Sequence, residues 1–391
     1  MSCSNLIELL RKLRAEKLTV ADLKDQFRDL KIHYEPHENG RVVLCNAKPC
    51  REKTPALIRQ CRGVVLESGT WKVLALGMPA LITEFKAANV SSRLQDFDVY
   101  EINDGTIVTL YHWKDKWCIA SANGYDVSQY KWLGETTYLE AVEELMRQYN
   151  TSWDELNPNS CYVIGFRHHS FHPLLADPQK LWFVDSFDLI SINSDNPTIT
   201  HGYVPAKIPA QTKPNIKWAE MVINNKSALA NFRQDIRKCN APRIHYGYIL
   251  RSKSGGGDYL LESDLLRYIR QMLYNVPKDI KLDHKTRIDY IVMRAAMSAT
   301  DRDFLNLYPQ YKDKHREFRR KFDEIARTIV NSMRQRRRQD NEPTEMNILK
   351  STLSKEINVF DPSAERIVRD HLMNKKYIHC VFKLLSVCES K

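Results

Sequence analysis

The spacing of apolar and polar positions differs between the two parts of the chain that meet near residue 263. Before that point, short runs of aliphatic and aromatic residues are separated by turn residues, a pattern typical of strands. Some segments of this part repeat apolar residues every three or four positions and predict helices instead: 6–17, 19–30, 137–149 and 217–239. After residue 263 the strand pattern ends, and helices are expected over 264–274, 286–299, 309–337, 344–357, 363–373 and 377–388. The pattern therefore predicts a mixed α+β part followed by an all-helical part.

The clearest strand pattern covers residues 99–122, VYEINDGTIVTLYHWKDKWCIASA. It predicts three short strands joined by two tight turns, because β-branched and aromatic residues flank Asn103-Asp104-Gly105 and Lys114-Asp115-Lys116.

This stretch resembles the nucleophile motif of ATP-dependent RNA ligases of the phage T4 RNA ligase 1 type. In that family a strand ends in Glu-Lys-x-Asp-Gly-Ser/Thr, followed by an aliphatic strand with a tyrosine and a returning strand with a tryptophan. Here the segment runs from Glu101 through Asp104 and Gly105 to Thr106, so the turn is retained. The position of the nucleophilic lysine holds Ile102.

The other motifs of the family can be followed along the chain in the same order. Arg62, in Arg-Gly-Val-Val-Leu-Glu, matches the arginine that contacts the nucleotide. Most of the other polar positions have changed. The lysine and the aromatic ring of the next motif correspond to Ala80 and Ile82, the two glutamates to Gly165 and Tyr246, and the two lysines of the last motif to Leu260 and Glu262.

The resemblance implies an α+β nucleotidyltransferase core (an ATP-grasp-like ligase adenylation fold) of antiparallel sheets and helices. We expect N-terminal helices over residues 1–40, this core over 41–265 and a helical domain over 266–391. A lysine amine must attack the α-phosphate of ATP in this chemistry, and isoleucine has no nucleophilic atom. We therefore expect a catalytically inactive RNA-ligase-like pseudoenzyme that binds RNA or acts as a scaffold in an RNA-processing or viral complex.

Two alternatives remain open. In the first, the protein is an active ligase that seals or repairs RNA ends with a displaced lysine, Lys86 or Lys114, and then requires ATP and magnesium. In the second, it is an assembly protein without RNA contact. A covalent nucleotide adduct would distinguish the active ligase from the two inactive proteins. Salt-dependent RNA binding would distinguish the RNA-binding pseudoenzyme from the assembly protein.

Charge adds a candidate nucleic-acid surface. The net charge is +11 and the isoelectric point about 9.1, which favours polyanionic partners such as RNA. The predicted helix from residue 311 has an apolar side and an arginine-rich side. The candidate RNA-binding arginines are Arg316, Arg319, Arg320, Arg327, Arg334, Arg336, Arg337 and Arg338.

Nine scattered cysteines and an N-terminal segment that reads as a first helix favour a cytoplasmic protein with reduced thiols. Cys45 and Cys50 lack a second ligand pair, so we expect no zinc site. His168, His169 and His172 are interpreted as structural or surface residues. No apolar run approaches the ~20 residues that span a bilayer, and no membrane contact is expected.

Overall fold

The computed structural model describes most of the chain. The described residues are 3–35, 40–46, 50–84, 94–131, 135–172, 179–200, 246–253, 257–263, 266–267, 284–297, 304–306, 308–335, 344–354, 357–358, 360–372, 381 and 384. The helix predicted over 217–239 and most of the last predicted helix lie outside this set. The chain forms two compact units, residues 1–172 with 178–269 and residues 173–177 with 270–391.

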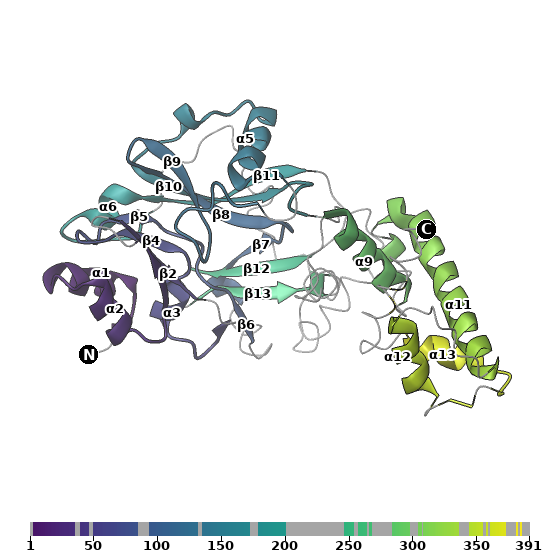
Figure 1. Cartoon of the computed structure of the whole chain (residues 1–391). Helices are drawn as coiled ribbons and strands as arrows, with labels where there is room; N and C mark the ends of the chain where they lie inside the picture. The colour runs from purple at the N-terminus through teal and green to yellow at the C-terminus, as the bar shows by residue number, and fades with distance from the viewer. Residues whose placement is uncertain are drawn as a thin grey trace. The chain divides into compact units, whose positions relative to one another are not determined.

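The first unit contains three sheets (Figure 1). One is antiparallel, with the order β1-β2-β4-β5. Its strands are β1 (Lys31–Tyr34), β2 (Arg41–Cys45), β4 (Val64–Glu67) and β5 (Val73–Ala75). The N-terminal helices α1 (Leu6–Ala15) and α2 (Val20–Gln26), the short α3 (Ala56–Gln60) and α6 (Leu189–Asn193) share a hydrophobic core with this sheet.

A second antiparallel sheet has the order β11-β10-β8-β9. Its strands are β8 (Thr106–Trp113), β9 (Lys116–Ala120), β10 (Ser160–Arg167) and β11 (Lys180–Asp188). The helix α5 (Tyr138–Gln148) packs Val142 and Leu145 against one face of this sheet, and β10 contributes Tyr162 and Ile164 to the same cluster. Since neighbouring residues of a strand point to opposite faces, Cys161 and Val163 join the core of the first sheet instead.

The third sheet has the order β3-β6-β13-β12-β7. Its strands are β3 (Cys50–Arg51), β6 (Ile82–Glu84), β7 (Phe97–Glu101), β12 (Gly247–Ser252) and β13 (Tyr259–Glu262). The pairs β3–β6 and β6–β13 are parallel, whereas β12 pairs antiparallel with both of its neighbours. The short 3-10 helix Leu94–Asp96 leads into β7, and another, Trp153–Glu155, precedes β10.

The second unit is helical in its described residues. After the 3-10 turn Pro309–Tyr311, the long helix α11 contacts the three other helices. These elements are α9 (His284–Ala296), α11 (Lys312–Gln335), α12 (Thr344–Leu353) and α13 (Ala364–Leu372). Phe318, Phe322 and Ile329 are buried on one side of α11, so the predicted apolar face is confirmed.

The predicted α+β class with a helical C-terminal region is confirmed, and the helices predicted from residues 19 and 137 begin beside these residues, as α2 and α5. The Thr19 and Thr137 side chains accept hydrogen bonds from the backbone amides of Asp22 and Glu140, and each forms a complete capping box. The apolar pattern of residues 181–190 predicts one strand, but β11 ends at Asp188. The Asp188 carboxylate accepts from the amides of Ile190 and Ser191, and this cap starts α6 instead.

In the part of the chain that the structure covers, no helix is long and apolar enough to cross a membrane.

Candidate functional site

The motif turn Ile102–Gly105 connects two different sheets. The strand before it, β7, pairs with β12 in the five-stranded sheet, whereas β8 after it pairs with β10. Both turns predicted in residues 99–122 are present, but the first joins strands of different sheets, whereas the second joins β8 and β9 within one sheet. A Cβ at Gly105 would lie closer than 3.0 Å to the Trp182 ring and to the Phe166 carbonyl oxygen, so only glycine fits where the chain changes sheets.

Ile102 is buried, and its backbone amide donates a hydrogen bond of 3.0 Å to the carbonyl oxygen of Gly247. Gly247 is paired with Glu262 across β12 and β13. Tyr246, just before this strand, is also buried, and its carbonyl oxygen accepts from the Ser263 amide at 2.9 Å. The fold therefore brings three of the changed motif positions, Ile102, Tyr246 and Glu262, to one end of the third sheet.

Gly165 lies in the neighbouring sheet, directly opposite Trp182 in the β10–β11 ladder. The Trp182 side chain is 1% exposed and covers the glycine. A Cβ at Gly165 would lie closer than 3.0 Å to three atoms of the indole. The indole therefore occupies the space that any side chain at Gly165 would need.

Two cations that no motif indicated lie beside the motif turn. The Arg167 Nε donates to the Asp104 carbonyl oxygen at 3.0 Å, and the Lys180 Nζ lies 3.5 Å from Oδ1 of Asn103. Arg167 and Lys180 face each other in the β10–β11 pairing. This register depends on the folded sheet and has no signal in the local sequence.

His168 and His172 contact polar side chains of β8 and α5. The His172 Nε2 lies 3.3 Å from the Thr106 hydroxyl at the start of β8, and the His168 Nε2 lies 3.2 Å from a carboxylate oxygen of Glu144. Burial lowers the pKa of both imidazoles, although hydrogen bonds to Glu144 and to the His168 backbone act in the opposite direction. His169 is exposed. The described residues contain no group of three or more side chains placed to hold a metal ion.

An ion pair connects the second and third sheets. The Arg251 guanidinium on β12 donates to the Asp185 carboxylate on β11 at 3.0 Å and lies 3.6 Å from the Asp258 carboxylate. Its central carbon lies 5.3 Å from the centre of the Tyr100 ring. Burial raises the pKa of Asp258, and nearby Arg251 partly offsets this effect. The Arg251 guanidinium thus binds the Asp185 carboxylate between these two sheets.

Arg62, which matches the family arginine by its motif, lies between α3 and β4. Gly63, which follows it, has a φ of +74°, and a Cβ there would meet the backbone of Ser121 and Ala122. The structure therefore places the Arg-Gly motif against the backbone that follows β9. Ala80, the changed lysine position of the next motif, is buried. It lines a cavity of about 210 Å³ together with Arg59, Pro79 and Asp258.

The last two changed positions differ in environment. Leu260 is buried and pairs with Ile249 of β12, whereas Glu262 is half-buried. Among the C-terminal candidates, Arg316, Arg319, Arg320, Arg327 and Arg334 are exposed on α11. Arg316 pairs with Asp313 at 3.3 Å and Arg320 with Glu324 at 3.9 Å, so part of this charge is neutralised on the helix itself. Arg336, Arg337 and Arg338 lie outside the described residues, as does Lys86.

Comparison with known proteins gives relatives along most of the chain, although no protein-family model matches it. A protein of African swine fever virus (strain Badajoz 1971 Vero-adapted), named "Putative RNA-ligase", is 30% identical over 325 residues, which cover 75% of this chain and 72% of the relative. A protein of the same name from isolate Tick/South Africa/Pretoriuskop Pr4/1996 is 29% identical over 374 residues, covering 88% of this chain and 80% of the relative.

Among solved structures, an archaeal ATP-dependent RNA ligase matches 97% of this chain and 82% of its own length, with 11% identity and a TM-score of 0.40. The assignment rests on sequence identity to the viral proteins, over most of both chains, and agrees with the resemblance seen in the motifs. The chain belongs to the RNA-ligase family of these viral proteins.

Proposed function

We propose that this protein is a catalytically inactive RNA-ligase-like protein that binds RNA. The observation that carries the proposal is Ile102 at the retained turn before Asp104 and Gly105. Nucleotidyl transfer in the family begins when a lysine amine attacks the α-phosphate of ATP and displaces pyrophosphate. A hydrocarbon side chain cannot form that phosphoramidate bond, whatever its surroundings.

The environment of the turn supports the same proposal. The Trp182 indole fills the space at Gly165, so a carboxylate cannot be placed there. The Arg251–Asp185 pair uses charges that would otherwise be available to a ligand between the sheets. Leu260 and Glu262 remove one positive charge and invert another relative to the family motif, which disfavours a triphosphate.

RNA is the proposed partner for two reasons. The named relatives are RNA ligases by description, and the chain carries a net charge of +11. The relatives are viral proteins, which agrees with the viral source implied by the resemblance. A scaffold role in an RNA-processing complex is compatible with this proposal, and we place the protein in the cytoplasm.

The test is an adduct assay. The full chain is incubated with α-labelled ATP or GTP and a divalent metal, then separated by denaturing electrophoresis. We expect no label at the position of the 45.7 kDa chain. A labelled band that survives denaturation would overturn the inactive assignment.

A second candidate function has one observation in its favour. Lys180 places an amine 3.5 Å from Asn103 in the motif turn, so an active ligase with a displaced nucleophile would use this lysine. Lys114 is a poorer choice because the eight residues of β8 separate it from the motif turn, roughly 25 Å at 3.3 Å per residue. If an adduct forms, Lys180→Met should abolish it and Lys114→Met should not.

The third possibility, an assembly protein without RNA contact, predicts a different result. Fluorescence anisotropy with a generic single-stranded RNA should then show no binding at physiological salt. Under the proposed function, binding is expected and should weaken steeply as salt is added, because counterions are released from the phosphates.

A further inference from the structure

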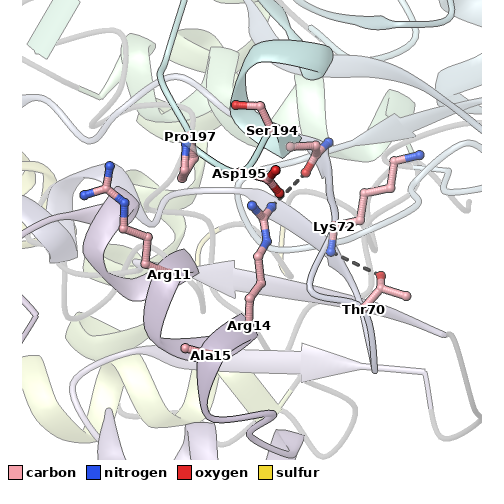
Figure 2. Close-up of a pocket in the computed structure, with 9 residues that line it drawn as sticks. Arg11, Arg14, Ala15, Thr70, Lys72, Ser194, Asp195 and Pro197 are labelled. Carbon is pink, nitrogen blue, oxygen red and sulfur yellow. Dashed lines mark hydrogen bonds between the residues drawn. The ribbon is translucent and has the colours of Figure 1, made fainter.

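A basic pocket lies in the first unit and includes none of the motif positions. It has a volume of about 690 Å³ and is lined by α1, by the turn between β4 and β5 and by the segment after α6. Figure 2 shows Arg14 projecting from α1 toward the segment with Asp195, with Arg11 of the same helix at one side and Thr70 and Lys72 at the other.

Arg14 is fixed in this pocket by uncharged groups. Its guanidinium donates to Oδ1 of Asn193 at 2.9 Å and to the carbonyl oxygens of Trp71 and Ile192 at 3.3 to 3.5 Å. Asn193 is itself held by two hydrogen bonds to the backbone of Val73, of 2.8 and 2.9 Å. All of these hydrogen bonds go to uncharged oxygens, so they orient the guanidinium but do not neutralise its positive charge.

The charges and the shape of the pocket define its ligand class. Among the described residues that line it, Arg11, Arg14 and Lys72 are cationic and Asp195 is anionic, a balance of three to one. Arg11 and Lys72 are exposed, and Arg14 is half-buried. The lining residues named for this pocket include no aromatic ring on which a base could stack. Such a site recognises phosphate groups and not the identity of bases.

We propose that this pocket binds consecutive phosphates of an RNA strand. The inference rests on the RNA-binding part of the proposed function and adds a location for it. A strand held here contributes affinity through its backbone, so the contact is independent of sequence. The exposed Arg11 and Lys72 neutralise phosphates, while the fixed Arg14 orients one of them.

The test uses the full chain, a labelled single-stranded oligouridine and anisotropy over a series of salt concentrations. Arg11→Gln/Lys72→Gln should weaken binding by roughly tenfold at about 0.1 M salt and reduce the salt slope by about 1.4, since each phosphate contact of a single strand contributes about 0.7. Asp195→Asn removes the one carboxylate and should strengthen binding about two- to threefold. All three side chains are exposed, so folding should be preserved.

The matched control is Arg28→Gln/Lys116→Gln, which removes one exposed arginine and one exposed lysine elsewhere in the first unit. It should change binding much less than the pocket variant. Equal losses in both double variants would overturn the pocket while leaving RNA binding intact. No RNA binding by the wild type would overturn both the pocket and the proposed function.

Inorganic tripolyphosphate tests whether the pocket binds a small polyphosphate instead of the phosphates of RNA. If it raises the melting temperature of the wild type but not of the pocket variant, while RNA affinity is the same in both, the pocket binds a small polyphosphate and the RNA assignment is wrong. Competition between tripolyphosphate and RNA, lost in the pocket variant, is the expected result.

Discussion

Trp182 lies directly opposite Gly165, and its indole occupies the space into which any side chain at Gly165 would project. The same ring limits Gly105 at the motif turn. One buried side chain on β11 thus excludes side chains at two motif positions that are 60 residues apart in sequence. At the position that the motif resemblance assigns to a glutamate, the packing of the indole leaves no room for a side chain.

The first prediction follows from this packing. Gly165→Ala should destabilise the protein by about 1 to 3 kcal/mol, because the added methyl group overpacks the contact with Trp182. Urea unfolding measures the change. In a Trp182→Phe background the penalty should shrink, since the smaller ring leaves room. Equal penalties in the two backgrounds would show that the residues do not interact.

The second prediction is that Ile102→Lys does not restore nucleotide transfer. The glutamates and the lysines of the later motifs are absent as well, and catalytic groups that act as a unit do not contribute additively. The adduct assay with labelled ATP measures this. Ile102→Met serves as a folding control because it keeps the volume of the buried side chain. Robust labelling of Ile102→Lys would mean that our assignment of the later motifs is wrong.

Local features of the fold were predictable because residues close in sequence determine them. The turn Asn103–Gly105 and the capping boxes at Thr19 and Thr137 depend on residues a few positions apart, so local chemistry is enough to predict them. The change of sheet at Gly105 is different, because it depends on which strands β7 and β8 pair with. That pairing joins distant segments.

The same contrast between local motifs and long-range pairing holds for the candidate site. Ile102 and Arg62 follow from their motifs and stay predictions, whereas no motif indicates the amine of Lys180 near Asn103. It lies there because β10 and β11 pair in one particular register, with Lys180 opposite Arg167. A lysine at the start of a strand has no local pattern that reports a contact made across a sheet.

The third prediction concerns pH. Burial holds the pKa of His172 below its ordinary value of 6.5, so the folded protein keeps this imidazole neutral while the unfolded chain takes up a proton. Its contribution to stability is therefore present above about pH 6.5 and is lost as the pH falls toward the lower folded-state pKa. Thermal unfolding should show a falling melting temperature between about pH 7 and about pH 5.

His172→Gln tests the origin of this loss. The variant should be less stable than the wild type at neutral pH, because the contact with Thr106 changes, yet its melting temperature should depend less on pH. His33→Gln, at an exposed position of β1, is the comparison. If wild type and His172→Gln had parallel pH profiles, His172 would not be the titrating group.

The fourth prediction concerns Arg41, which is buried between two carboxylates and two aromatic rings. Its guanidinium binds Glu35 at 2.6 Å and Asp126 at 2.9 Å, and its central carbon lies 4.3 Å from the centre of the Trp113 ring. Burial alone raises the pKa of Asp126, but hydrogen bonds from Ser128 and Arg41 bring it below its ordinary value. Arg41→Met would leave two carboxylates without their partner.

We expect Arg41→Met to destabilise the protein by about 3 to 5 kcal/mol, the range for breaking a buried ion pair on one side. The control is Arg51→Met, because Arg51 pairs with Glu84 at 2.7 Å but both side chains are more than half exposed. That change should cost no more than about 1 kcal/mol. Urea unfolding of both variants provides the comparison, and similar losses would contradict a special role for Arg41.

The fifth prediction concerns the arginine run at the end of α11 and just beyond it. Replacing Arg334, Arg336, Arg337 and Arg338 by glutamine should reduce the salt slope of RNA binding by about 2 to 3, since four phosphate contacts are removed. The fold should be unaffected, because the described Arg334 is exposed and exposed charged side chains contribute little to stability.

The competing explanation for this run is that it docks onto an acidic protein surface, in which case it adds nothing to RNA affinity. The matched control removes four exposed cations of the first unit by glutamine substitution, at Arg28, Lys31, Lys53 and Lys116. Both variants have the same net charge, so a general loss of positive potential affects them equally. Only a local contact weakens RNA binding more in the arginine-run variant. Identical affinities and slopes for that variant and the wild type would exclude the run from RNA binding and favour the protein partner.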